Sequence, residues 1–253
     1  MKLRGIAVFL CTPACIAALA CTDLSGSSTG VLSIQFDSLA APSVVLGDTL
    51  RDTTGAVIVP AVHAFNFKGE EITSVPVRFQ SPDSGVVVDS VTGTVFGDSL
   101  RSTAARIVAS VGSLQAVQKV DVTLRPDLLA AVTGRDSLSY SVIDSTLNVS
   151  PRLEVKLTHG GAPNDSAVKS YIVSFAIVSQ SDPGLGTLVN DAGRPSVIDT
   201  TDTNGVAGRA IRLHPVFLVS ETDSIIVSAT ARYRGIAVSG SPVRLVLKIK
   251  PRS

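Results

Sequence analysis

The chain has 253 residues, of which 45% are hydrophobic, and this is enough for one or two globular domains with hydrophobic cores. Its 22 basic residues are balanced by 21 acidic residues, and no block of like charge occurs. The chain therefore lacks the basic surface that binding to the phosphates of DNA or RNA requires, and we expect no nucleic-acid partner. It has no Trp and only 4% aromatic residues, so its cores should be built from aliphatic side chains.

The first 20 residues have the layout of a secretory signal peptide. Two basic residues come first, an apolar run follows from Gly5 to Ala20, and small residues stand just before Cys21. The run falls short of the roughly 20 apolar residues that a transmembrane helix needs, and Pro13 interrupts it. We therefore expect residues 1–20 to be cleaved and the rest of the chain to be exported.

Cys21 would be the only cysteine left after cleavage, because the other two lie at positions 11 and 15. A single thiol cannot form an internal disulfide, so its presence in an exported chain calls for another explanation. The segment resembles the signal of bacterial lipoproteins. This resemblance implies lipid attachment at Cys21, a membrane anchor made of lipid, and a place in the cell envelope, with the outer membrane expected. Ordinary signal-peptidase cleavage and plain secretion are the alternative.

Small and polar residues follow Cys21 as far as residue 30, and residues 21–30 are expected to form a flexible tether. Beyond them, apolar and polar residues alternate with a period of two, which is typical of half-buried strands, and no helical stripe of useful length appears. The clearest alternations lie at residues 120–125, 153–157, 225–233 and 243–250. In the third of these, one face should be buried, and it consists of Ile225, Val227, Ala229, Ala231 and Tyr233.

Turn residues separate these alternating segments. The strongest turn signal is Asn204-Gly205, because a two-residue type I′ hairpin needs positive φ at both central residues. Many short strands joined by turns are typical of an all-β sandwich or barrel. Pro126 cannot continue a strand ladder and follows one clear alternation. We therefore expect two domains, at residues 31–125 and 126–253.

Both expected domains resemble bacterial immunoglobulin-like families. The order of segments in residues 40–124 is similar to group 2 domains, with residues 51–60 as extra length, and it is carried by Gly47–Leu50, Gly69–Ile72, Val77–Asp83, Val88–Val95 and Ala105–Ala109. Residues 147–250 are similar to the group 1 type of invasins and intimins, through Leu153–Leu157, Gly161–Pro163, Val173–Phe175 and Thr201–Ala207. The resemblance implies two tandem Greek-key β-sandwiches that serve in adhesion, display or spacing at bacterial surfaces, without catalytic residues.

One segment carries a possible enzymatic signal. Gly97-Asp98-Ser99-Leu100 resembles the nucleophile block of GDSL esterases, whose serine needs a histidine base and an oxyanion hole. The block lies in mid-chain among strands, and the Asp-x-x-His of that family is absent. A turn between two strands explains the same residues, so we expect no catalytic residue. The G-x-S-x-G pattern of residues 26–30 lies in the tether and is a chance match.

Metal and ligand sites are not expected either. His63, His159 and His214 are far apart in sequence, and no zinc-ligand spacing occurs. A group of Asx residues could supply oxygens to calcium, but such residues also stabilise turns, which is the interpretation we prefer; they are Asn190, Asp191, Asp199, Asp202 and Asn204.

The C-terminal strand is basic on one side. Lys248, Lys250 and Arg252 are expected to protect an exposed sheet edge, and attraction of acidic glycans or lipid headgroups is the alternative.

These observations favour a non-enzymatic, lipid-anchored envelope protein without cofactor or metal. It would present immunoglobulin-like modules to a protein or glycan partner for adhesion or protein interaction. A passive spacer or accessory subunit of an envelope complex is one alternative, and a secreted GDSL-type esterase is another.

Overall fold

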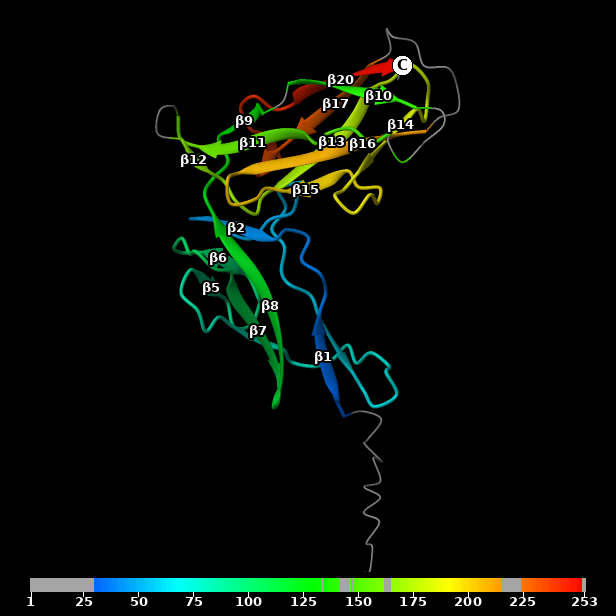
Figure 1. Ribbon diagram of the computed structural model, residues 1–253. Helices are drawn as coiled ribbons and strands as arrows, with labels where there is room; N and C mark the ends of the chain where they lie inside the picture. The colour runs from blue at the N-terminus through cyan, green and yellow to red at the C-terminus, as the bar shows by residue number, and fades with distance from the viewer. Residues whose placement is uncertain are drawn as a thin grey trace, which may run out of the picture.

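The computed structural model describes residues 30–132, 134–141, 146, 148–161, 165–214 and 224–251, and the elements in these ranges are β-strands (Figure 1). The all-β prediction is therefore confirmed. Within the described ranges, no helix is long and apolar enough to cross a membrane. The expected signal peptide, Cys21 and the tether as far as residue 29 lie outside the described residues, as does the chance G-x-S-x-G match except for its last residue.

The N-terminal sandwich contains eight strands: β1 (Ser33–Phe36), β2 (Ser43–Val45), β3 (Val62–Phe65), β4 (Arg78–Gln80), β5 (Val86–Val88), β6 (Val95–Gly97), β7 (Ala105–Val111) and β8 (Leu114–Thr123). One sheet has the order β2-β8-β7-β4, and the opposite layer is split into the pairs β1-β3 and β5-β6. Strand β2 runs parallel to β8, whereas the other pairs are antiparallel. In chain order, β2 and β8 are the first and last strands of this sheet. The chain between them makes the long crossover that a parallel pair needs, and their pairing brings the two ends of the domain together.

The C-terminal sandwich contains β9 (Leu128–Ala131), β10 (Arg135–Tyr140), β11 (Leu153–His159), β12 (Ser166–Ala167), β13 (Ile172–Ser179), β14 (Gly186–Val189), β15 (Ile198–Thr200), β16 (Val206–Leu213), β17 (Ser224–Thr230), β18 (Arg232–Tyr233), β19 (Ile236–Ala237) and β20 (Val243–Pro251). One layer has the order β10-β20-β17-β13-β15. The other has the order β12-β11-β16-β14, and β9 also pairs with β11.

The strand order is that of an immunoglobulin-like sandwich. When β9, β11, β13, β14, β16, β17 and β20 are taken as strands A to G, one layer has the order A-B-E-D and the other contains C-F-G, which is the immunoglobulin arrangement. In the N-terminal sandwich, β4, β7 and β8 form the C-F-G layer in the same way. Strand pairing thus supports the fold that the segment order of the sequence implies.

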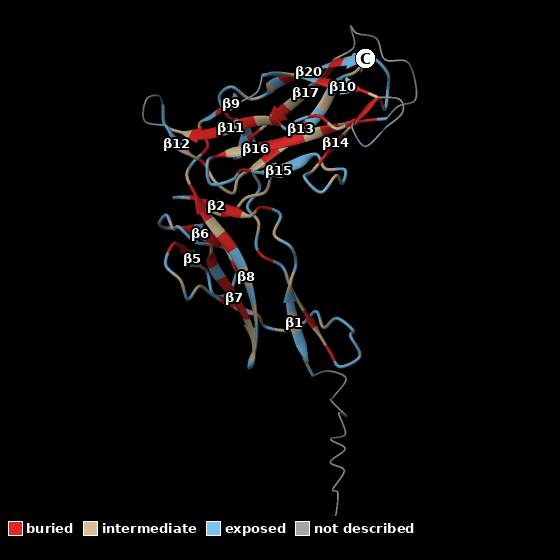
Figure 2. Cartoon of the chain, in the orientation of Figure 1, coloured by how far each residue is buried: buried red, intermediate tan, exposed pale blue. Residues whose placement is uncertain are grey.

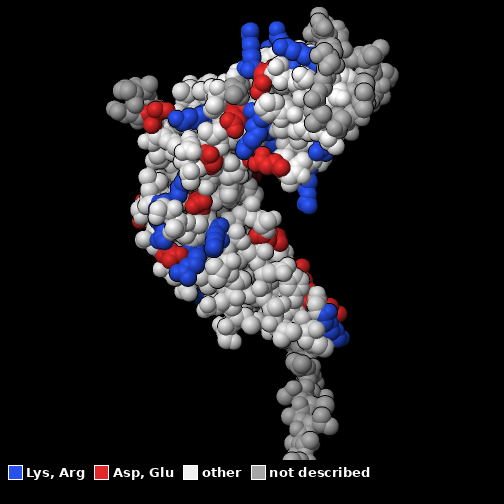
Figure 3. Space-filling view, viewed as in Figure 1, with Lys and Arg blue, Asp and Glu red and all other residues white. Residues whose placement is uncertain are grey.

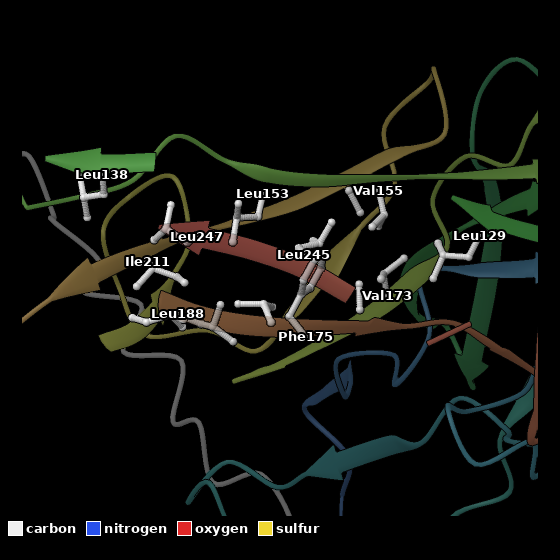
Figure 4. Packing of buried hydrophobic residues seen from close by; sticks show 14 of the residues in the cluster. Leu129, Leu138, Leu153, Val155, Val173, Phe175, Leu188, Ile211, Leu245 and Leu247 are labelled. Atoms are coloured by element: carbon white, nitrogen blue, oxygen red, sulfur yellow. The ribbon is translucent and has the colours of Figure 1, made fainter. Parts of the chain in front are cut away.

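Each sandwich has its own hydrophobic core (Figure 2). One cluster of buried residues lies between positions 41 and 122, and the second lies between positions 129 and 249. Figure 4 shows Leu153 and Val155 of β11 in the same layer as Leu245 and Leu247 of β20, between the two sheets. Two tandem sandwiches are therefore confirmed, while a boundary between residues 125 and 126 stays a prediction.

The alternations of the sequence identify the buried faces. Leu245, Leu247 and Ile249 of β20 are fully buried, and Lys248 and Lys250 between and beyond them are exposed. On β17, Ile225, Val227 and Ala229 are fully buried as expected, and so is Ala231 beyond it. Tyr233 is only partly buried, because it lies in the short strand β18 at the margin of the core.

Two sequence predictions about local structure are wrong. Strand β20 lies between β10 and β17 rather than at an edge, so Lys248 and Lys250 do not protect a sheet edge; Arg252 lies outside the described residues. Asn204-Gly205 does not form a two-residue hairpin, because β15 and β16 belong to different layers. Only Gly205 of this pair has positive φ, and the loop from Asp202 to Val206 carries the chain between the layers.

Candidate functional site

The two sandwiches meet at a junction that the sequence did not predict. Asp48, just beyond β2, is buried there, with only 3% of its side chain exposed. Its carboxylate accepts hydrogen bonds from the backbone N–H of Thr49 at 2.8 Å, from Nε of Arg51 at 3.2 Å and from Nε of Arg234 at 2.7 Å. Arg234 belongs to the C-terminal sandwich, so this carboxylate joins the two units.

Electrostatics keep Asp48 ionised. Burial acts to raise the pKa of its carboxyl, but the hydrogen bonds from Arg234, Thr49, Tyr233 and Arg51 outweigh burial and hold the pKa well below its usual range. The group is therefore a permanent anion at neutral pH and attracts cationic side chains from both sandwiches.

The hairpin of β18 and β19 presents Arg234 to this carboxylate. Arg232 pairs with Ala237, and Tyr233 pairs with Ile236, so the turn consists of Arg234 and Gly235. Their φ angles of 51° and 78° are those of a type I′ turn, which prefers Asn, Asp or Gly at both positions. A left-handed conformation costs an arginine about 1 kcal/mol, and its ion pair with the first sandwich can offset this.

A loop of the first sandwich touches the same hairpin. Oδ1 of Asp52 accepts hydrogen bonds from the backbone N–H groups of Thr54 and Ala56 and shapes the loop. A Cβ atom built on Gly55 would lie 2.3 Å from the backbone N of Gly235, so the two backbones approach as closely as glycine allows. The extra length at residues 51–60 therefore contributes to the contact with the neighbouring domain.

A second set of contacts lies beside the first. The hydroxyl of Ser43 donates to the carbonyl of Ser170 at 2.6 Å, and the hydroxyl of Ser170 donates to Oδ2 of Asp121 at 2.7 Å. Nζ of Lys169 donates to the carbonyl of Arg101 at 2.8 Å. Ser170 has φ of 55°, so the two non-glycine residues with positive φ in the described chain both lie at the junction. Backbone strain of this kind is concentrated at functional sites.

Apolar contacts also cross the junction. Ile172 of β13 packs against the core of the N-terminal sandwich, and Leu124, which follows β8, packs against the core of the C-terminal sandwich. Each unit thus covers part of the other's hydrophobic surface. Together with the hydrogen bonds and the ion pair, these contacts join the two sandwiches, and Figure 1 shows the C-terminal sandwich above the N-terminal one, with its strands running across the view.

The junction encloses a cleft of about 520 Å³, lined by segments 41–54, 171–174 and 230–234. Tyr171 and Tyr233 line it, and the hydroxyl of Tyr171 donates to the carbonyl of Arg232 at 2.6 Å. Burial raises the pKa of Tyr171 well above its usual value, and it also raises the pKa of Tyr233. Both phenols therefore stay protonated at neutral pH, and their O–H protons are used within the junction, by Tyr171 toward the Arg232 carbonyl and by Tyr233 toward Asp48.

The structure does not assemble the residues of an esterase site around Ser99. This serine is exposed just beyond β6, where its backbone N–H donates to the carbonyl of Gly85 at 3.3 Å. The three histidines contact other groups. His63 contacts Glu71 and Asp37, His159 contacts Asp127 and the Arg125 carbonyl, and His214 contacts Thr187. Residues 97–100 run from the end of β6 into a loop, which agrees with the turn interpretation.

The Asx group also serves local structure. Oδ1 of Asn190 and Oδ1 of Asp202 each accept two backbone N–H bonds within their own loops, which is turn stabilisation. Asp199 forms ion pairs with Arg152 at 3.1 Å and Arg209 at 2.8 Å, so arginines occupy the place that a cation would need. In the described part of the chain, no group of three or more His, Cys, Asp or Glu residues could hold a metal ion.

Charges on the molecular surface are mixed. Figure 3 shows basic and acidic side chains interspersed on the face in view, with much of the lower part of the molecule uncharged. The lipid-attachment residue expected at Cys21 lies outside the described residues. Two features of the sequence lie at the junction: the outward face of segment 225–233, which carries Thr230 and Arg232 and continues to Arg234, and the extra length at residues 51–60.

Comparisons with known proteins identify no family. A scan against family models found no match, and neither did a search of curated proteins. Among solved structures, the adhesin InvE of Yersinia pseudotuberculosis is similar at 12% identity, with 88% of this chain and 61% of that chain covered and a TM-score of 0.36. Domains 4 and 5 of the S-layer protein SbsC are similar at 14% identity, with 87% and 98% covered and a TM-score of 0.31.

The EC1-2 fragment of human protocadherin-24 is similar at 15% identity, with 88% of this chain and 100% of that chain covered and a TM-score of 0.26. Because these TM-scores are low, the immunoglobulin-like fold rests on the strand order and the two cores described above.

Proposed function

We propose that the chain is a non-enzymatic protein of the bacterial cell envelope, anchored by lipid at Cys21, and that its two immunoglobulin-like sandwiches present a binding surface for adhesion or protein interaction. Three sequence features support the location in the envelope: the signal-like residues 1–20, the lone cysteine and the polar segment after it. The all-β architecture supports the role, because sandwiches of this kind display loops on a stable scaffold.

The observation that carries the proposal is the set of polar and backbone contacts across the junction. Tandem domains are expected to move relative to each other unless the interface between them is extensive. Here, Asp48 with its two arginine partners, the contact of Gly55 with Gly235, and the seryl contacts at Ser170 hold both sandwiches together. A surface built from both units keeps its shape at a distance from the membrane, as a presented binding surface must.

A passive spacer is the second candidate, and the same junction contacts favour it, since a stiff rod would also keep its partners apart. The two candidates differ at the cleft. A spacer needs no concave polar site between its domains, whereas a presenting protein uses one. The cleft lined by Tyr171, Tyr233 and three arginines therefore supports presentation.

The anchor is tested by metabolic labelling with a clickable fatty acid. The full chain and its Cys21→Ser variant are produced in a Gram-negative host, and membranes are separated from soluble fractions. We expect label and membrane location for the wild type and neither for the variant. A wild type that is exported without label and is found in the soluble fraction would instead indicate plain secretion.

Presentation is tested by adhesion of whole cells. Cells that carry the full chain and cells that lack it are compared on surfaces coated with glycans or with purified envelope and matrix proteins. We expect the chain to increase adhesion to at least one coating. Equal adhesion on every coating would support the spacer.

A further inference from the structure

The cleft between the sandwiches has an excess of positive charge. Arg51, Arg232 and Arg234 line it together with two carboxylates, Asp48 and Asp52. Asp48 accepts from Arg51 and Arg234, and Oδ1 of Asp52 accepts from the backbone and the hydroxyl of Thr54. Both carboxylates are therefore engaged in building the cleft.

Arg232 is the arginine of the cleft that pairs with neither of these two carboxylates. It is exposed, and its Nη1 donates to the carbonyl of Gly235 at 3.2 Å. Among the described residues it has no carboxylate partner, although Asp48 pairs with its neighbour Arg234. A guanidinium has five N–H donors in a planar fork that matches a carboxylate. The geometry therefore provides an anchor for an anionic group of a ligand.

Tyrosines and short hydroxyl side chains make up most of the remaining polar lining. Two of the chain's three tyrosines, Tyr171 and Tyr233, lie here. Six hydroxyl side chains also line the cleft, at Ser43, Thr49, Thr53, Thr54, Ser174 and Thr230. Tyrosine offers an apolar ring together with a polar hydroxyl, and short hydroxyl side chains both donate and accept. A ligand with many hydroxyl groups and small apolar faces suits this lining, and a sugar has both.

We propose that the junction cleft binds an acidic saccharide, that is, a sugar that bears a carboxylate, and that Arg232 holds the carboxylate. The volume of about 520 Å³ lies within the range of small-molecule sites and accommodates one or two sugar rings. This inference deepens the proposed function by naming a class of partner, and it rests on that function for its biological meaning.

The proposal is tested on the full-length protein with two matched probes. Methyl β-D-glucuronide carries a carboxylate where methyl β-D-glucoside carries a hydroxymethyl group. Binding of each is measured by calorimetry and by saturation-transfer difference NMR. We expect the glucuronide to bind at least about tenfold more tightly, since charge-assisted bidentate hydrogen bonds are the strong ones.

Arg232→Gln removes the charge and should lower glucuronide affinity at least about tenfold, to the level of the glucoside. Arg232→Lys keeps the charge without the fork and should bind with intermediate affinity. Arg78→Gln is the matched control, because Arg78 is an exposed arginine on β4 outside the cleft, and it should bind as the wild type does. Melting curves verify that each variant is folded, and selectivity of the wild type decides the matter if a position 232 variant is not.

Several outcomes would overturn the proposal. Equal affinity for the two glycosides would remove the carboxylate anchor, and unchanged binding by Arg232→Gln would remove Arg232. Equally tight binding of N-acetyl-alanyl-alanine would mean that the cleft recognises a peptide carboxylate instead of a sugar. If no probe binds although cells carrying the chain adhere, the saccharide inference fails while the proposed function stands.

Discussion

Asp48 is a buried junction residue whose carboxylate accepts hydrogen bonds from arginines of both sandwiches. Its side chain is 3% exposed, and it accepts from two arginines and from a backbone N–H group. A buried charge with one partner removed is destabilising, because the remaining groups keep their desolvation cost without compensation. The arginines are less buried, with Arg234 52% exposed, so water reduces this effect.

We expect Asp48→Asn to lower the free energy of unfolding by about 2 kcal/mol at neutral pH. The asparagine keeps the size of the side chain but loses the charge that holds Arg51 and Arg234. Urea unfolding measures the difference. Asp98→Asn is the control, since Asp98 is an exposed aspartate outside the junction, and it should change stability by less than about 0.5 kcal/mol.

The effect of Asp48→Asn should depend on pH. The folded pKa of Asp48 is held below its usual range, whereas the unfolded pKa is about 3.9. A lowered folded pKa contributes stability above the unfolded pKa, and this contribution is lost as the pH falls from about 4 toward the folded pKa. The difference between wild type and variant should therefore be constant above about pH 5 and shrink below about pH 4. A difference that grows on acidification would contradict this assignment.

At the scale of single elements, the central strands of the C-terminal sandwich carry its stability. Val227 of β17 and Leu245 of β20 are fully buried and pair with each other across the sheet. Each buried aliphatic side chain contributes roughly 1.5 to 3 kcal/mol, and an uncompensated carboxylate at the same place costs far more.

Val227→Asp or Leu245→Asp should therefore abolish cooperative unfolding of the C-terminal sandwich, with a loss on the order of 5 kcal/mol. Differential scanning calorimetry of the full chain measures this as a missing transition. Val178→Asp introduces the same charge at a valine that is 53% exposed on β13, and it should leave the transition in place. A transition like that of the wild type in either core variant would refute the assignment of the buried face.

Strands β1 and β3 are linked by a titratable group. The Nδ1 of His63 on β3 lies 2.7 Å from Oε1 of Glu71, and its Nε2 lies 3.0 Å from Oδ2 of Asp37 beyond β1. The hydrogen bond with Glu71 and then that with Asp37 raise the pKa of His63. The protonated imidazole therefore bridges the two carboxylates.

A raised folded pKa gives stability that is complete below the unfolded pKa of about 6.5 and is lost as the pH rises through the folded pKa. We expect the N-terminal sandwich of the wild type to lose stability as the pH rises above about 6.5, and His63→Gln to lose less over the same rise. Unfolding by urea at several pH values measures both. Equal slopes for the two proteins would show that this link does not stabilise the folded state.

Sequence alone predicts buried faces better than sheet position. The alternation around Leu245 and Leu247 identifies their buried face, because side-chain direction follows from strand geometry within one strand. Whether β20 lies at an edge depends on β10 and β17, which flank it, and no local pattern records its neighbours. The hairpin prediction at Asn204-Gly205 is wrong for the same reason, since a hairpin requires that its two flanking strands pair with each other.

At the scale of the whole molecule, the junction could not be predicted from the sequence. Asp48 and Arg234 are 186 positions apart, and each looks like an ordinary surface residue within its own sandwich. The extra length at residues 51–60 was visible, but its purpose becomes clear only when Gly55 is seen against the hairpin of β18 and β19. The candidate site thus depends on the relative placement of two domains rather than on a motif in either.

If contact between these loops fixes that placement, Gly55→Ala should release it. The added Cβ would lie 2.3 Å from the backbone N of Gly235, so the loop and the hairpin must separate. Residual dipolar couplings measure the result, because a rigid pair of sandwiches has one alignment tensor and a mobile pair has two. We expect one tensor for the wild type and two for the variant, with stability lower by about 1 kcal/mol.

Gly69→Ala separates this collision from ordinary backbone strain. Gly69 also has positive φ, at 78° against 92° for Gly55, but no atom lies within 4 Å of the position of its Cβ. The control should therefore show a similar loss of stability and keep a single tensor, because only the backbone preference changes. A single tensor for Gly55→Ala as well would mean that Asp48, Ser170 and the apolar contacts hold the sandwiches without this loop, and the extra length at residues 51–60 would need another explanation.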